Sequence, residues 1–144
     1  MNKLSKTQCG EFEAVNVAFQ GAWQDASEAV ETYNLKETTW KELKVTLDDL
    51  ESAKDAAHTL ITATVEAMQE YYDSKSEKWQ EGDKGTAYYG WIESWQDMAD
   101  RLQDTMVKMT CVAEVEQGNV LLEDLITDTL EEDCLNELTT EPDG

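Results

Sequence analysis

The stretch WKELKVTLDDLESAKDAAHTLITATVEAMQEYY, residues 40–72, decides the fold of this chain. Apolar or long side chains recur in it at alternating intervals of three and four residues: Trp40, Leu43, Leu47, Leu50, Lys54, Ala57, Ile61, Thr64, Met68 and Tyr71. This is the period of a helix that packs along a second helix. Thr39 and Glu42 are spaced as a capping box at its start. We predict a helix over about residues 40–80, roughly 60 Å long at 1.5 Å per residue.

The stretch EGDKGT, residues 81–86, interrupts this pattern. Its two glycines suit the end of a helix, and Asp83 or Thr86 can cap the start of the next one. A second apolar stripe follows over about residues 87–117 and includes Tyr88, Trp91, Trp95, Met98, Leu102, Met106 and Met109.

Folding the two stripes together about residues 83–84 brings apolar side chains opposite each other. Trp79 then faces Tyr88, and Tyr72 faces Trp95. This agreement predicts an antiparallel helical hairpin.

Both ends of the chain also have helical patterns. Ser5 and Gln8 have the spacing of a capping box, Leu4 and Cys9 that of the hydrophobic staple around it, and an apolar stripe runs from Phe12 to Tyr33. After the residues GN at 118–119, a stripe at every fourth residue consists of Leu122, Ile126, Leu130, Cys134 and Leu138. We expect an all-α protein: an elongated bundle built on the long hairpin, with flanking N- and C-terminal helices. Residues 1–138 form its single domain, and residues 139–144 form a disordered tail.

Composition narrows the class of protein. The 144 residues fit one domain, and five Trp and five Tyr supply a core despite a net charge of −21. Three cysteines without a CxxC pair fit a reducing compartment. We see no signal peptide and no apolar run of the roughly 18–20 residues that span a bilayer. We therefore expect a cytoplasmic protein that contacts no membrane.

Signals of catalysis are poor. The single histidine, His58, follows Asp55 by one helical turn, but a helical metal site needs further inward-facing ligands. The glycines at residues 81–86 lack the preceding strand and the spacing of a phosphate-binding loop, so a turn between helices explains them better. The acidic stretches lack the spacing of an EF-hand. We expect neither an enzyme nor a bound cofactor or metal.

The charge is unevenly distributed along the chain. Residues 109–144 contain eleven acidic residues and no basic one, and residues 7–35 contain five acidic residues and no basic one. Residues 36–84, by contrast, have a net charge of only −5. If the two terminal helices are neighbours, their outer faces form an extended anionic surface. The expected members of this surface are Glu11, Glu13, Asp25, Glu28, Glu31, Glu123, Asp124, Asp128, Glu131, Glu132, Asp133 and Glu137.

The density of this charge suggests a function. The seven acidic residues at 123–137 lie along about 21 Å of helix, or one per roughly 3 Å, and one strand of B-DNA has one phosphate per roughly 3.4 Å. A protein that binds DNA phosphates would bind such a surface with the same basic side chains. We therefore expect a DNA mimic whose partner is a basic nucleic-acid-binding protein, and no direct contact with nucleic acid. A solvated acidic face that only keeps the protein soluble is the plain alternative.

A resemblance adds context. Residues 71–95, YYDSKSEKWQEGDKGTAYYGWIESW, resemble small acidic helical proteins of phages and mobile elements. The residues that carry the likeness are Ser76, Glu77, Trp79, Gln80, Gly85, Ala87, Tyr88 and Trp91. The charge and size also resemble phage DNA mimics that block restriction or CRISPR systems. These resemblances imply a helical fold, a target among host defence proteins and, if a phage encodes the chain, the host bacterial cytoplasm.

The aromatic residues support a second hypothesis. Tyr88, Tyr89, Trp91 and Trp95 either close the tip of the hairpin as core residues or form an exposed contact surface. In the second case the protein is a non-catalytic acidic adaptor or assembly protein that binds through its heptad stripe and its aromatic tip. A homodimer through the long helix is compatible with both hypotheses.

Overall fold

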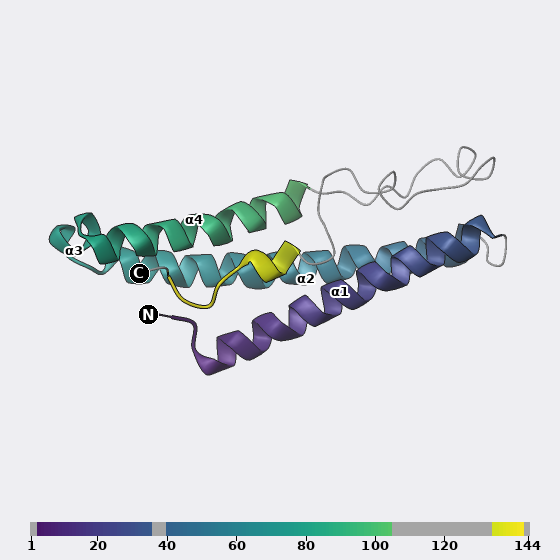
Figure 1. Ribbon diagram of the computed structural model, residues 1–144, viewed down its shortest axis with the longest axis horizontal. Helices are drawn as coiled ribbons and strands as arrows, with labels where there is room; N and C mark the ends of the chain where they lie inside the picture. Colours follow the sequence, from purple (N-terminus) through teal and green to yellow (C-terminus); the bar gives the residue numbers. More distant parts are fainter. Residues whose placement is uncertain (1–2, 36–39, 105–133, 143–144) are drawn as a thin grey trace.

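The computed structural model of this chain describes residues 3–35, 40–104 and 134–142. Its long helices, α1 (Lys6–Asn34), α2 (Trp40–Asp73) and α4 (Asp83–Asp104), form an elongated bundle, and a short helix α3 (Glu77–Glu81) lies at one end (Figure 1). Both α1 and α4 pack on α2, and the described residues contain no strand. The predicted all-α helical bundle is therefore confirmed.

The first helix begins as its sequence predicts. The Ser5 side chain accepts a hydrogen bond from the Gln8 backbone, and the Gln8 side chain accepts one from the Ser5 backbone at 2.8 Å. Leu4, which precedes this capping box, is buried. The predicted stripe faces the core, where Phe12, Phe19, Ala26 and Val30 are buried. Capping and one apolar face thus account for a helix of 29 residues.

The second helix buries the predicted stripe along most of its length. Its fully buried members are Leu43, Leu47, Leu50, Ala57, Ile61 and Met68. The two polar members of the stripe are buried as well, since Lys54 is 5% exposed and Thr64 is 6% exposed. The Thr64 hydroxyl donates a hydrogen bond to the Leu60 carbonyl at 2.9 Å, so its burial leaves no unpaired donor.

The second helix is shorter than predicted. It ends at Asp73 instead of continuing to residue 80. The Ser74 hydroxyl donates to the Tyr71 carbonyl at 2.6 Å, and the Ser76 side chain accepts from the backbone amide of Trp79 and caps α3. Serine side chains compete with backbone hydrogen bonds in this way, which favours a break between two helices over one continuous helix.

The hairpin is confirmed, but its pairing differs from the prediction in part. The rings of Trp79 and Tyr88 lie 5.8 Å apart, as expected. Tyr72 does not face Trp95: its ring lies 6.5 Å from Tyr88 and 5.6 Å from Tyr89. The reason is that α3 occupies the turn and α4 begins at Asp83 rather than at residue 87, which shifts the pairing.

The last described segment lies between α1 and α4, over α2 (Figure 1). It begins as a 3-10 helix, η1 (Cys134–Glu137), whereas we predicted an α-helix ending at residue 138. The rest of that predicted helix, like residues 105–117 of the preceding one, lies outside the described residues.

Hydrogen bonds tie this segment to α4 and to the residues that precede α1. The carbonyl of Thr139 accepts from the indole nitrogens of Trp91 and Trp95 at 2.9 and 3.1 Å. The carbonyl of Thr140 accepts from the Leu4 amide at 2.8 Å. Thr139 and Thr140, which we had expected in a disordered tail of residues 139–144, therefore make specific contacts with the bundle.

Candidate functional site

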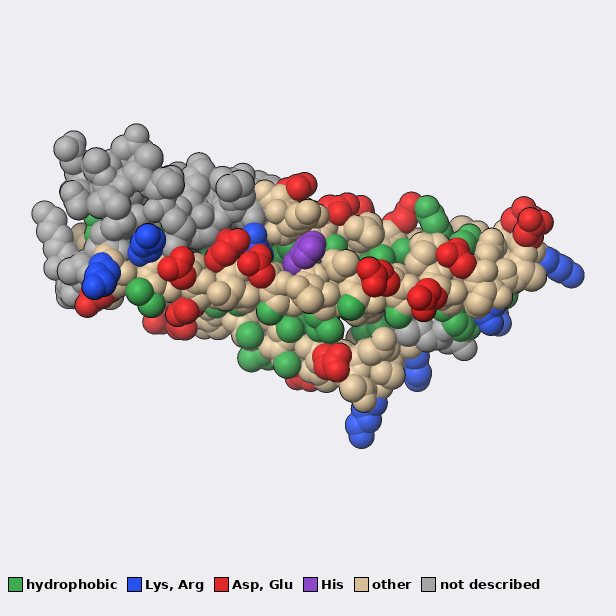
Figure 2. Space-filling view, turned by 180° about the vertical axis from the view of Figure 1, so that it is seen from behind, with side chains coloured by type: hydrophobic (Ala, Val, Ile, Leu, Met, Phe, Trp, Pro, Cys, Tyr) green, Lys and Arg blue, Asp and Glu red, His purple; other side chains and the backbone are tan. Residues whose placement is uncertain are grey.

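The outer face of α2 has a row of carboxylates. Seven acidic side chains on this helix are exposed. Glu42 lies in the first turn, and we call the other six the α2 acidic row: Asp48, Asp49, Asp55, Glu66, Glu70 and Asp73. From the first to the last of these six there are 25 residue steps, or about 38 Å at 1.5 Å per residue. Figure 2 shows acidic side chains spread along the length of the molecule on one face. One turn of B-DNA is of similar length, about 34 Å.

No exposed lysine or arginine interrupts this row, because the only Lys or Arg in residues 45–74 is Lys54, which is buried. The Lys54 ammonium lies 3.0 Å from Glu51 Oε1 and 3.8 Å from Asp55 Oδ1, and its side chain is 7% exposed. The charge of Lys54 therefore lies beneath the row and not among the exposed carboxylates.

A second row follows the outer face of α4. Its four exposed members recur at intervals of four, three and four residues, and we call them the α4 acidic row: Glu93, Asp97, Asp100 and Asp104. This spacing places them on one side of the helix, opposite the buried face that includes Trp95 and Leu102. The only base in residues 85–104 is Arg101, whose guanidinium lies 3.2 Å from Glu137 Oε2.

The exposed bases lie outside these rows. Lys41 and Lys44 are in the first turns of α2, Lys3 and Lys6 are at the start of α1, and Lys78 and Lys84 are at the α3 end. Figure 2 shows several basic side chains towards the ends of the molecule, and others nearer its middle. The members of the two rows are all exposed carboxylates.

The terminal acidic surface that we predicted is described only in part. All five of its members on α1 are exposed: Glu11, Glu13, Asp25, Glu28 and Glu31. Glu137 is exposed too, but it is ion-paired with Arg101. The remaining members lie outside the described residues: Glu123, Asp124, Asp128, Glu131, Glu132 and Asp133.

The aromatic residues at the tip of the hairpin lie mainly in the core. Tyr88, Trp91 and Trp95 are buried, and only Tyr89 is exposed, at 44%. Burial, together with the nearby Tyr71, raises the pKa of Tyr88 to about 12. Of the two interpretations that we left open for these residues, their burial fits the closing of the tip.

Lys75 covers part of this aromatic cluster. Its ammonium lies 4.5 Å from the centre of the Tyr71 ring and 5.7 Å from that of Trp79. A cation over aromatic rings is an attractive arrangement. Lys75 therefore adds to the stability of the tip.

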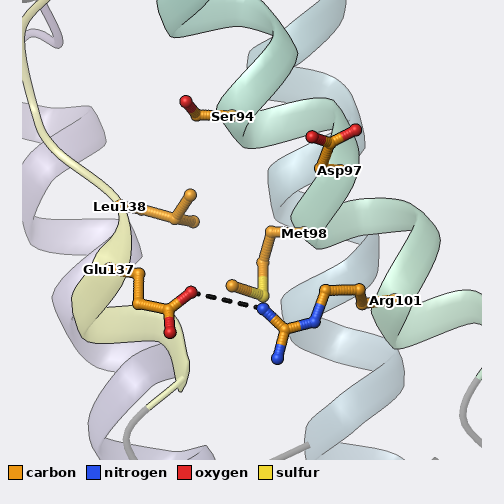
Figure 3. A pocket seen from close by; sticks show the side chains of 6 residues that line it. All are labelled: Ser94, Asp97, Met98, Arg101, Glu137 and Leu138. Atoms are coloured by element: carbon orange, nitrogen blue, oxygen red, sulfur yellow. Dashed lines mark hydrogen bonds and ion pairs between the residues drawn. The ribbon is translucent and has the colours of Figure 1, made fainter.

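A pocket of about 320 Å³ opens between α4 and the last described segment (Figure 3). Ser94, Asp97, Met98 and Arg101 line it from α4, and Glu137 and Leu138 line it from the other side. Asp97 belongs to the α4 acidic row, so this pocket adjoins an anionic surface.

The other candidate groups show no chemical site. His58 is half-buried on α2, Cys9 is half-buried and Cys134 is buried. Within the described parts of the chain, no three His, Cys, Asp or Glu side chains gather as metal ligands would. No helix in those parts is long and apolar enough to cross a membrane.

Sequence reasoning missed both acidic rows. The spacing of the α4 row was visible in the sequence. We did not predict this row because we considered the two regions with the highest net charge, and these four acidic residues lie between them. The α2 row was not predicted because the positive charge of Lys54 was included in the net charge of this region. The apolar stripe, however, places Lys54 on the inward face of the helix. Assigning each charge to a face of its helix would have found both rows.

No protein family, curated protein or solved structure matches this chain.

Proposed function

We propose that this protein is a DNA mimic that inhibits a basic nucleic-acid-binding protein by occupying its DNA-binding surface. A host defence protein of the restriction or CRISPR type is the target class that we favour. The observation that carries the proposal is the pair of acidic rows, within whose stretches the lysine is buried and the arginine is half-exposed and ion-paired. Both bases within these stretches, Lys54 and Arg101, are engaged in ion pairs.

The large negative charge of the chain supports the same proposal. Exposed carboxylates on one protein repel each other and disfavour the compact state. A net charge of magnitude about 2–8 is enough to keep a small domain soluble, and this chain has −21. A complementary basic groove would relieve the repulsion, so the charge is useful in a complex.

The shape of the molecule supports the same proposal. The α2 row follows a helix of 34 residues, which holds its carboxylates in a fixed linear order. Its members are on average about 6–8 Å apart along the helix, a wider spacing than the roughly 3.4 Å of one DNA strand. The α4 row and the α1 acids add charge on neighbouring helices. The likeness to DNA therefore rests on several helices together.

The first test is capture of a partner. The tagged protein is used as bait in a nuclease-treated bacterial lysate, and bound proteins are eluted with a salt gradient. We expect a DNA-binding protein that is released by a few hundred millimolar salt and is displaced by duplex DNA, because binding through phosphate contacts is strongly salt-dependent. A main partner that withstands high salt and ignores DNA would favour the adaptor hypothesis and overturn mimicry.

Charge reversal then locates the surface on the captured partner. One variant changes Asp48, Glu66 and Glu70 to Lys, and a second changes Glu93, Asp100 and Asp104 to Lys. A matched control changes Glu77, Glu81 and Asp83 to Lys, which are exposed residues at the α3 end.

All three variants change the net charge equally. We expect the row variants to lose binding by at least about tenfold while the control keeps most of it. Equal losses in all three would mean that only the overall charge matters, and would contradict a defined DNA-like surface.

A further inference from the structure

The pocket in Figure 3 combines an apolar floor with a charged rim. The floor consists of Met98 and Leu138, which are 3% and 8% exposed. The rim has the carboxylates of Asp97 and Glu137 and the guanidinium of Arg101. This combination differs from the rest of the acidic rows, where carboxylates stand on an exposed helix surface.

The charges of the rim determine whether the pocket attracts a positively or a negatively charged ligand. Arg101 already pairs with Glu137 at 3.2 Å, so this pair contributes little net charge. Asp97 forms no ion pair with the described residues, and Asp100 lies close to it on the same helix face. A ligand with a negative charge is therefore repelled, and a ligand with a positive charge is attracted.

We propose that this pocket receives the side chain of a basic residue of the partner protein. The aliphatic stem of a lysine or arginine packs on Met98 and Leu138, and its cationic end lies at the carboxylate of Asp97. Such side chains bury their methylene groups on apolar surface while their charge stays near water. The pocket supplies both environments side by side, which an acidic row by itself does not.

This inference rests on the proposed function and deepens it. A flat acidic surface attracts any basic protein, whereas a pocket that accommodates the stem favours a partner with a basic side chain at the matching place. Anchor residues that fill a pocket contribute strongly to the affinity of a protein interface. The pocket would thus add selectivity to an attraction that is otherwise only electrostatic.

The test uses small probes on the whole protein, without any partner. n-Butylammonium has the stem and the charge of a lysine side chain. Ammonium has the charge alone, and n-butanol has the stem alone. Each probe is titrated at constant ionic strength, and binding is read from the NMR signal of the Met98 methyl group in protein with isotope-labelled methionines. The chain has five methionines, so the other methyl groups report effects away from the pocket.

We expect a saturable shift of the Met98 signal with n-butylammonium at millimolar concentration, and weaker shifts with ammonium and n-butanol. Asp97→Asn should weaken this binding about two- to fivefold, the effect of one exposed charge pair. Asp100→Asn is the matched control, because it removes the same charge from the same helix face but does not line the pocket. It should leave the affinity nearly unchanged.

Three results would overturn the proposal: no saturable shift of Met98, equal binding of ammonium and n-butylammonium, or equal weakening by the two substitutions. Both substituted residues are exposed, so circular dichroism should show unchanged folding. If n-butylammonium did not bind, the proposed role of the pocket would be rejected and the DNA-mimic proposal would not be affected. If n-butylammonium bound but no DNA-binding partner were captured, the DNA-mimic proposal would be rejected and the cation-binding pocket would be retained.

Discussion

The ammonium of Lys54 lies 3.0 Å from the carboxylate of Glu51, three residues earlier on α2. This contact turns the one base in the middle of α2 away from the solvent, and it leaves the acidic row uninterrupted. Lys54 is nearly buried, whereas the Glu51 side chain is 37% exposed. The pair therefore lies at the border between the core and the acidic face.

Substituting Lys54 alone should destabilise the protein more than substituting Lys54 and Glu51 together. In Lys54→Met the Glu51 carboxylate loses its cation, and its Oε2 atom is already buried without a hydrogen-bond partner among the described residues. We expect a loss of about 1–3 kcal/mol in the free energy of unfolding. The double variant Glu51→Leu, Lys54→Met should recover part of that loss. Urea denaturation of the four proteins in this cycle measures both effects, and additive losses would contradict the pairing.

Gly85 is needed for the close approach of α3 to α4. A Cβ atom at this position would overlap the carbonyl oxygens of Trp79 and Gln80 and lie 2.5 Å from Gln80 Cα. These are backbone atoms, so α3 would have to move. We expect Gly85→Ala to lower the free energy of unfolding by about 1–3 kcal/mol.

Gly90 supplies the control for that substitution. It lies on the same helix, and a Cβ atom there meets nothing within 4 Å. Gly90→Ala should raise stability by about 0.5–1 kcal/mol, because alanine favours a helix. If urea denaturation showed that both substitutions change the free energy of unfolding in the same direction, this result would contradict the close approach of α3 to α4 at Gly85.

The fold was predictable where a periodic pattern decides it. The three-four spacing assigned even Lys54 and Thr64 to the buried face, since a helix fixes the direction of each side chain whatever its chemistry. The end of α2 was less predictable, because it depends on hydrogen bonds of Ser74 and Ser76 that compete with helix continuation only locally. Predicting the acidic rows required assigning each charged residue to a face of its helix. The net charge of a sequence segment does not contain that information. The position of residues 134–142 depends on hydrogen bonds that donors distant in sequence make to backbone carbonyls of this segment, and no sequence pattern marks these bonds.

The two indole groups that share one carbonyl should behave cooperatively. Trp91 and Trp95 both donate to the Thr139 carbonyl, so either single Trp→Phe variant leaves this acceptor with one donor. The double variant leaves it with neither. We expect the double variant to lose more stability than the sum of the single losses, by about 0.5–1.5 kcal/mol. Hydrogen exchange at the Leu4 amide, which binds the next carbonyl, should speed up most in the double variant.

Trp91→Leu and Trp95→Leu test whether the lost hydrogen bond or the lost ring causes this effect. Leucine removes the ring as well as the donor, so its single variants should be less stable than the phenylalanine variants. Strictly additive phenylalanine losses, with no change in Leu4 exchange, would show that the shared carbonyl contributes nothing to holding this segment.

Tyr88 should make stability fall at alkaline pH. Burial and the nearby Tyr71 raise the pKa of its hydroxyl from 10.0 to about 12. Between these pH values the unfolded chain loses the proton and the folded protein keeps it, so the unfolded state is favoured increasingly. The stabilisation is fully present below about pH 10 and is lost as the pH rises through about 12.

Tyr88→Phe removes this titration. The hydroxyl has no hydrogen-bond partner among the described residues, so its removal should leave stability at neutral pH unchanged or raised by up to about 1.5 kcal/mol. Urea denaturation at pH 7 and pH 11 should show a smaller fall for Tyr88→Phe than for the unchanged protein. An equal fall in both would assign the alkaline loss to other groups.

Neutralising the α2 row should separate stability from binding. In the triple variant Asp48→Asn, Glu66→Gln, Glu70→Gln, three exposed like charges disappear while the shape of the face is kept. We expect a gain of a few tenths of a kcal/mol per charge at low salt, because mutual repulsion falls, and a smaller gain at high salt, where repulsion is already screened. Binding to a captured DNA-binding partner should weaken in the same variant. A face that only keeps the protein soluble would show the gain in stability without the loss of binding, and that result would contradict mimicry by this row.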